Sequence, residues 1–136
     1  MTAPLEKFRI LTELSPEERV SLASFLEEQS YEDGRAIFRR RDEAAELLLL
    51  TDGRIRLASG DAELGELAPG SALGHASLVA IGRRACAAYA KGAVSVLKLT
   101  REAYLRLRGD HPQIALSLQE GLLRNFADTA RKVVPD

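Results

Sequence analysis

The chain has 136 residues, of which 46% are hydrophobic and 29% are charged. These values are typical of one soluble globular domain, and the length leaves no room for a separate output domain. The net charge of −1 argues against a nucleic-acid surface, which needs a basic stripe, and the single cysteine excludes an internal disulfide. Since no apolar segment reaches the length of a signal peptide or membrane span, we expect a cytoplasmic protein without membrane insertion.

The first clear element is a helix start after a short N-terminal segment. Ser15 is placed to cap the helix, a proline follows it, and Glu18 can reach back to complete a capping box. Apolar residues then recur at helical spacing, which predicts a helix over residues 16–28. With a shorter helix expected over residues 4–11, residues 1–29 form the N-terminal helices.

The next part of the chain, residues 30–100, changes to short apolar runs interrupted by glycines. This spacing is typical of all-β folds and predicts about seven or eight short antiparallel strands. Residues 54–57 alternate between basic and apolar side chains, as a half-buried strand should. The runs that indicate strands are residues 36–38, 47–51, 54–59, 62–67, 85–90 and 94–100.

Helical patterns return after Thr100. Residues 101–109 are predicted to form a short helix that ends at a glycine. Pro112 then begins the last helix, where its missing N–H costs nothing, so residues 101–134 form the C-terminal helices. The expected fold is one α+β domain over residues 1–136, a β-roll or jelly roll flanked by helices.

The last predicted helix has two apolar faces. Leu118 and Leu122 can face the roll, whereas a second row recurs at alternating intervals of seven, three and four residues. Two copies packed on this row, here named the apolar seam, would hide it in a two-fold contact, so we expect a homodimer. The apolar seam comprises Leu116, Leu123, Phe126, Ala130 and Val133.

Residues 73–87 combine a glycine turn, small side chains and an arginine. A glycine turn that opens a short helix aims unpaired backbone N–H groups outward, which favours anion binding. Gly74 permits the turn, and Ala76 and Ser77 let a ligand approach the backbone closely. Arg84 can donate two hydrogen bonds to phosphate oxygens. The segment therefore suits a phosphate.

The chain resembles a cyclic-nucleotide-binding domain, the fold shared by catabolite-activator-type regulators, kinase regulatory subunits and gated channels. The resemblance covers nearly the whole chain and is carried by LSPEER, YEDGRAIF, LLLLTDGRIRL, LGELAPGSALG and LTREAYLRL. The family's phosphate cassette begins with phenylalanine, glycine and glutamate, and ends with arginine followed by small residues. Here the same positions are Leu73, Gly74 and His75, then Arg84, Ala85, Cys86 and Ala87.

The resemblance implies a ligand at this cassette, either a cyclic nucleotide (cyclic AMP or cyclic GMP) or another anion. His75 stands where the family has an acid that binds the ribose 2′-hydroxyl, and Arg83 adds a charge beside it. We therefore expect weak binding of cyclic mononucleotides and better acceptance of a cyclic dinucleotide or inorganic phosphate. The implied ligand-binding residues are Gly74, His75, Ala76, Ser77, Arg84 and Ala85.

Several of these residues have a plainer interpretation. Arg84 and His75 can also be exposed polar residues, and Cys86 is predicted to be a small core residue in a strand. Arg41 replaces a family glycine, and because arginine tolerates a positive φ poorly, we expect that turn to be rebuilt. His111 precedes a helix start and is interpreted as a local cap.

These patterns together favour a regulatory module rather than an enzyme. The sequence has no Ser/His/Asp arrangement, metal-ligand spacing or paired carboxylates, so we expect no catalytic residues and no metal site. By family analogy, ligand binding repositions the C-terminal helix and changes the contact with an unidentified protein partner. The alternative is a degenerate member that no longer binds cyclic mononucleotides and acts in protein interaction or dimerisation. No DNA-binding helices are expected after Val134.

Overall fold

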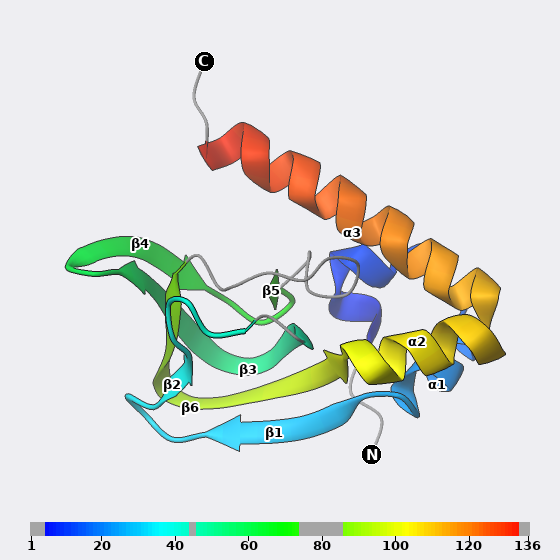
Figure 1. Ribbon diagram of the computed structural model, residues 1–136, viewed down its shortest axis with the longest axis horizontal. Helices are drawn as coiled ribbons and strands as arrows, with labels where there is room; N and C mark the ends of the chain where they lie inside the picture. Colours follow the sequence, from blue (N-terminus) through cyan, green and yellow to red (C-terminus); the bar gives the residue numbers. More distant parts are fainter. Residues whose placement is uncertain (1–4, 44–45, 74–85, 134–136) are drawn as a thin grey trace.

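A computed structural model describes residues 5–43, 46–73 and 86–133, with side chains in the last helix described as far as Arg124. Over these residues a curved antiparallel sheet forms one half of the molecule (Figure 1). Helices from both ends of the chain gather at the other half. The expected α+β fold, a rolled sheet flanked by helices, is confirmed.

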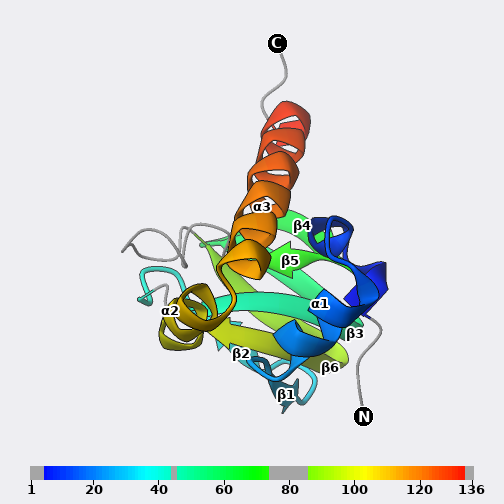
Figure 2. The ribbon, with the colours of Figure 1, turned by 90° about the vertical axis from the view of Figure 1, so that its right-hand side faces the viewer.

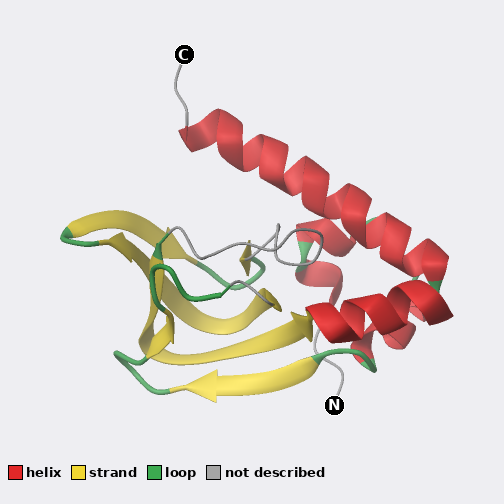
Figure 3. Ribbon diagram, viewed as in Figure 1, coloured by secondary structure: helices red, strands yellow, loops and turns green. Residues whose placement is uncertain are grey.

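The elements follow one another in the order helices, strands, helices (Figure 3). The helices are η1 (Leu5–Lys7) and η2 (Arg9–Leu11), both 3₁₀, and α1 (Pro16–Ala23), α2 (Arg101–Asp110) and α3 (Pro112–Val133). The strands are β1 (Glu27–Tyr31), β2 (Ala36–Phe38), β3 (Glu46–Ser59), β4 (Ala62–Leu67), β5 (Ala72–Leu73) and β6 (Ala87–Thr100).

The sheet is organised around its two long strands, β3 and β6, which pair antiparallel along most of their length. The order across the sheet is β1-β6-β3-β4, with β2 paired to β6 and β5 paired to β3. The described residues form six strands, whereas about seven or eight were expected for the whole chain. Two pairs of predicted short strands are single strands, and β1 and β5 are strands that the sequence runs did not indicate.

The long strands remain continuous because irregular pairing absorbs the breaks that the sequence suggests. The register between β3 and β6 shifts on either side of Asp52, next to Gly53, which adopts a φ of 86°. Glycine adopts this left-handed conformation without the steric cost that a side chain adds. Residues 47–51 and 54–59 therefore belong to one bent strand. In the same way, the described part of the predicted strand 85–90 that is in β6, residues 87–90, is continuous with residues 94–100.

The sheet separates two hydrophobic clusters, and the leucine run at the start of β3 supplies both. Leu48 and Leu50 lie in the roll cluster, inside the curved sheet, with Ile55 and residues of β5 and β6. Leu47 and Leu49 belong to the helical cluster, between the sheet and the helices. Because successive side chains of a strand point to opposite faces, a continuous apolar run indicates a strand that is covered on both sides.

Helix α1 begins as expected and ends earlier than expected. The Ser15 side chain accepts from the Glu18 amide, and the Glu18 carboxylate accepts from the Ser15 amide, so the capping box is complete. The prediction of a helix over residues 16–28 is wrong beyond Ala23, because β1 starts at Glu27 and pairs with β6. Backbone pairing with a distant strand outweighs the local helical spacing.

Two further expectations at the N-terminus and in the β2–β3 turn need correction. Within residues 4–11, the described part forms two short 3₁₀ helices rather than one helix. The turn after β2 is not rebuilt, because Arg41 adopts a φ of 74°. Asp42 supports that turn through its carboxylate, which accepts from the Arg39 amide at 2.8 Å. The aspartate thus helps to hold the backbone in a conformation that arginine does not favour.

The C-terminal helices agree closely with the sequence pattern. Thr100 caps α2 by accepting from the Ala103 amide, and α3 begins at Pro112. Helix α2 runs through its glycine and ends at Asp110, one residue later than predicted. Of the two apolar faces of α3, the inner one is buried at Leu118 and Leu122, whereas Leu116 and Leu123 are exposed. The side chains of Phe126, Ala130 and Val133 lie outside the described part.

Candidate ligand-binding site

The predicted phosphate cassette lies between the end of β5 and the start of β6. The six implied ligand-binding residues fall in the segment 74–85, which lies outside the described residues. The structure does describe the residues on both sides of this segment. They are Leu73 before it and Cys86 and Ala87 after it. The candidate site is therefore built from its two anchors and the surface around them.

The first anchor is β5, a two-residue strand fixed on β3. Leu73 pairs with Leu48, and Ala72 pairs with Leu49. Leu73 is buried in the roll cluster, whereas Ala72 packs against the helical cluster. The residue just before the cassette thus contacts the roll, and its neighbour contacts the helical layer.

The second anchor is the start of β6. Ala87 pairs with Ala58 near the far end of β3, and Ala88 is fully buried in the roll cluster. Cys86 is half-buried and lies one residue before β6, so its predicted place in a strand and in the core is wrong. Because β5 and β6 pair with opposite edges of β3, residues 74–85 connect the two edges of this strand.

Two basic side chains on the strands near the second anchor, Arg56 and Lys91, are paired with acidic residues. Arg56 lies 4.7 Å above the ring of Tyr89 and 3.9 Å from Glu63. Lys91 donates to Glu66 at 2.6 Å, and this hydrogen bond holds the pKa of the Glu66 carboxyl below its usual range. These two cations are therefore less available to an anionic ligand between the anchors.

Two tyrosines are titratable groups near the clusters. Tyr31 packs against the roll cluster, and burial raises its pKa although Lys98 partly lowers it. Tyr104 is buried in the helical cluster, where its hydroxyl lacks a hydrogen bond of ordinary geometry within the described part of the chain. Burial raises the pKa of Tyr104 as well. Because both pKa values are raised, both hydroxyls stay protonated near neutral pH.

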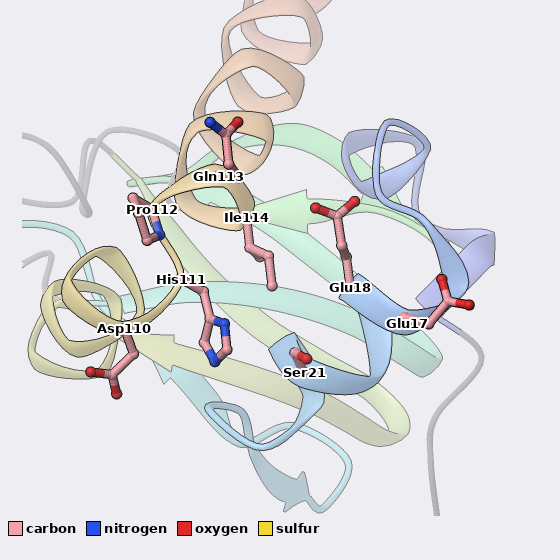
Figure 4. Close-up of a pocket in the computed structure, with 8 residues that line it drawn as sticks. All are labelled: Glu17, Glu18, Ser21, Asp110, His111, Pro112, Gln113 and Ile114. Carbon is pink, nitrogen blue, oxygen red and sulfur yellow. The ribbon is translucent and has the colours of Figure 1, made fainter.

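A separate pocket of about 380 Å³ lies where α1 faces the turn between α2 and α3 (Figure 4). His111 lines it, and its ring packs edge-on against Phe25 at 6.0 Å. The His111 amide donates to Leu107, and its carbonyl accepts from Ala115, so the backbone of His111 joins the two helices. The Glu18 carboxylate in this pocket is occupied by the capping box, and no metal-binding group occurs among the described residues.

Comparison with known proteins assigns the family. The sequence profile of the cyclic nucleotide-binding domain matches residues 28–111, which is more than half of the chain. The chain belongs to this family. The family resemblance that the sequence motifs indicated is thereby confirmed, and the matched range includes the segment between β5 and β6.

Relatives of the cyclic nucleotide-binding domain family support the same assignment. The cyclic AMP receptor protein of Thermus thermophilus is 32% identical over 120 residues, which is 85% of this chain and 56% of that protein. The cAMP-dependent protein kinase regulatory subunit of Dictyostelium discoideum is 30% identical over 118 residues, 81% of this chain and 36% of that protein. The chain therefore spans about half, or less, of the length of these relatives.

The fold matches solved structures closely. The N-terminal domain of a transcriptional regulator from Streptomyces coelicolor superimposes with a TM-score of 0.81 at 22% identity, covering 96% of this chain and 95% of that one. At this identity the match shows the fold alone. Among the described helices, none combines the length and the apolar character that a bilayer crossing requires.

Proposed function

We propose that this cyclic nucleotide-binding domain is a regulatory module that binds a cyclic nucleotide or a related anion at its cassette. The observation that carries the proposal is the family match, which runs through the cassette between β5 and β6. The two anchors support it, since they hold both ends of the segment against β3. Relatives named as a cyclic AMP receptor and a kinase regulatory subunit support the regulatory role.

In this proposal the cassette residues take the roles that their chemistry suits. Gly74 opens the turn, and the small residues Ala76 and Ser77 expose backbone amides to the phosphate. Arg84 donates two hydrogen bonds to phosphate oxygens, with Ala85 beside it. These hydrogen-bond donors suit the binding of an anion, and the proposal includes no catalytic step.

His75 determines how tightly a cyclic mononucleotide binds. The family's acid at this position accepts from the ribose 2′-hydroxyl, and histidine removes that negative charge. Loss of a charge-assisted hydrogen bond costs about 1.5 to 3 kcal/mol, or roughly ten- to hundredfold in affinity. We therefore propose weak cyclic AMP binding and preference for a more anionic guest, such as a cyclic dinucleotide or inorganic phosphate.

A ligand bound in the cassette can change the packing of α3 through β3 and β5. Leu73 ends β5 inside the roll, and its neighbour Ala72 packs on the helical cluster. Leu49, which pairs with Ala72, belongs to the cluster that contains Leu118 of α3. A shift of β5 by a bound ligand therefore passes to the face against which α3 is packed.

Calorimetric titration with cyclic AMP, cyclic GMP and a cyclic dinucleotide tests the proposal. His75→Glu should tighten cyclic AMP binding about ten- to hundredfold, because it restores the charged acceptor. Arg84→Ala should weaken binding of any nucleotide by about 2 to 5 kcal/mol, with little change in the thermal stability of the empty protein. Arg83→Ala, which removes the neighbouring charge, is the matched control and should have a much smaller effect.

The titration also distinguishes the alternatives. Sub-micromolar cyclic AMP binding by the unaltered chain would contradict the role given to His75. If Arg84→Ala lowers the melting temperature of the empty protein by several degrees, Arg84 is structural. Absence of binding by both the unaltered chain and His75→Glu would favour a degenerate domain that acts in protein interaction or dimerisation.

The apolar seam of α3 supports a homodimer as part of this proposal. Leu123 is 69% exposed and Leu116 is 49% exposed, and both lie on the face opposite the buried leucines. Leu123→Glu should prevent association because it buries a charge at the contact between copies. Leu105→Glu on α2, at a residue that is 47% exposed, is the matched control. Sedimentation of the unaltered chain as a monomer at tens of micromolar would contradict the dimer.

A further inference from the structure

At Gly121, helix α3 approaches the backbone of the 3₁₀ helix η2. A Cβ atom built on Gly121 would lie 2.0 Å from the Ile10 carbonyl oxygen and 2.9 Å from its carbon. Figure 2 shows the two elements side by side. Since the obstacle is a main-chain carbonyl, no change of side-chain rotamer can make room, and only glycine fits at the present separation.

The residues around this contact hold the same two elements together. Leu118 and Leu122, on either side of Gly121, are buried in the helical cluster with Leu11. Beyond the contact, Arg124 donates to Glu13 at 2.5 Å. The contacts that hold α3 near η2 therefore lie in one short stretch of the helix, residues 118–124.

Gly121 lies near the C-terminal end of the stretch of α3 whose side chains pack on the domain. The buried side chains described on this helix fall between Ile114 and Leu122, and Leu123 is exposed. A second helical glycine, Gly109 of α2, has no atom within 4 Å of its hypothetical Cβ. Gly109 is exposed near the end of α2, whereas Gly121 is buried within α3 and faces the Ile10 carbonyl, so only Gly121 lacks room for a side chain.

We propose that Gly121 is the release point of α3, a contact that exists only while the helix is seated on η2. Van der Waals attraction falls steeply with distance, and a contact without side chains has no flexible atoms that could follow a displaced helix. A small displacement of α3 therefore removes the whole contact between Gly121 and Ile10. The helix is then either seated on η2 or released from it. The regulatory use of this release rests on the function proposed above, whereas the contact can be tested without any ligand.

Hydrogen exchange of the full chain, comparing Gly121→Ala with Gly109→Ala, tests the release point. Gly121→Ala pushes α3 away from Ile10, so exchange should rise about tenfold or more over residues 8–14 and 114–122. The strands of the roll should keep their protection. Gly109→Ala, which meets no neighbour, should increase exchange nowhere and should raise the melting temperature by about 2 to 4 °C.

Two results would overturn the proposal. One is that Gly121→Ala behaves like Gly109→Ala, which would mean that the backbones do not touch in solution. The other is that exchange rises equally in the roll, which would mean that α3 cannot be released by itself. If Gly121→Ala does not fold, Glu13→Gln removes the adjacent ion pair. It should produce the same pattern at about two- to fivefold, and no localised change would again contradict the release point.

Discussion

The roll cluster and the helical cluster share strands but are assembled from different lengths of chain. Members of the roll cluster, including those partly buried, fall between Tyr31 and Val96. The helical cluster joins residues from Leu5 to Leu122, so it forms only when the two ends of the chain meet. The helical cluster therefore depends on a contact between the two ends of the chain that the roll cluster does not need.

The prediction with the largest expected effect compares two adjacent leucines, one from each cluster. Leu49 lies in the helical cluster and Leu50 in the roll cluster, and both are almost fully buried. Each change to alanine should lower the free energy of unfolding by about 2 to 5 kcal/mol, measured by urea denaturation. Leu49→Ala should increase hydrogen exchange chiefly in α3 and η2, and Leu50→Ala chiefly in the strands. Identical exchange patterns would show that the clusters are one cooperative unit.

A second test addresses the bend that lets β3 curve around the roll. A Cβ on Gly53 would lie 2.2 Å from the Ala93 carbonyl oxygen, whereas one on Gly60 meets nothing within 4 Å. Both glycines have positive φ, so Gly60→Ala should cost about 1 kcal/mol from backbone strain alone. Gly53→Ala should cost about 2 to 4 kcal/mol, because overpacking adds to the strain. Equal losses in thermal denaturation would contradict the close approach of β3 and β6 at this bend.

The smallest expected effect concerns the exposed pair beside the roll. The Lys91 hydrogen bond lowers the pKa of Glu66, so this pair stabilises the fold above the ordinary glutamate pKa of about 4.3. The contribution is lost as the pH falls through the lowered pKa, and salt should weaken it because the pair is exposed. NMR titration should show the pKa of Glu66 rising toward its ordinary value in Lys91→Gln. An unchanged pKa would mean that the pair does not form in solution.

Much of the helical layer could be predicted because its signals are local. Ser15 and Glu18 form the expected capping box, and Pro112 begins α3 as expected. The cap positions act within one turn, so the residues that decide them are adjacent in the sequence. The division of α3 into a buried face with Leu118 and an exposed face with Leu116 was also predictable from its period.

The strands were less predictable because their partners are distant. Residues 24–28 continue a helical spacing, but pairing with β6 begins a strand at Glu27. The positive φ of Arg41 was not expected either, since its support comes from Asp42 and from the closure of the turn. For the candidate site, the motifs indicated the cassette, but only the pairing of Leu73 with Leu48 shows how β5 fixes its first end.

The sequence by itself determined the α+β class, the helix starts, the order of the segments and the family, because these depend on periodicity, caps and motifs within short stretches. Only the tertiary structure decided that β3 and β6 are continuous and that their alternate residues serve two clusters. It also decided the role of Gly121, since a glycine in a helix has no local purpose until the Ile10 carbonyl faces it. Contacts between residues more than a hundred positions apart leave no local pattern, and packing alone brings them together.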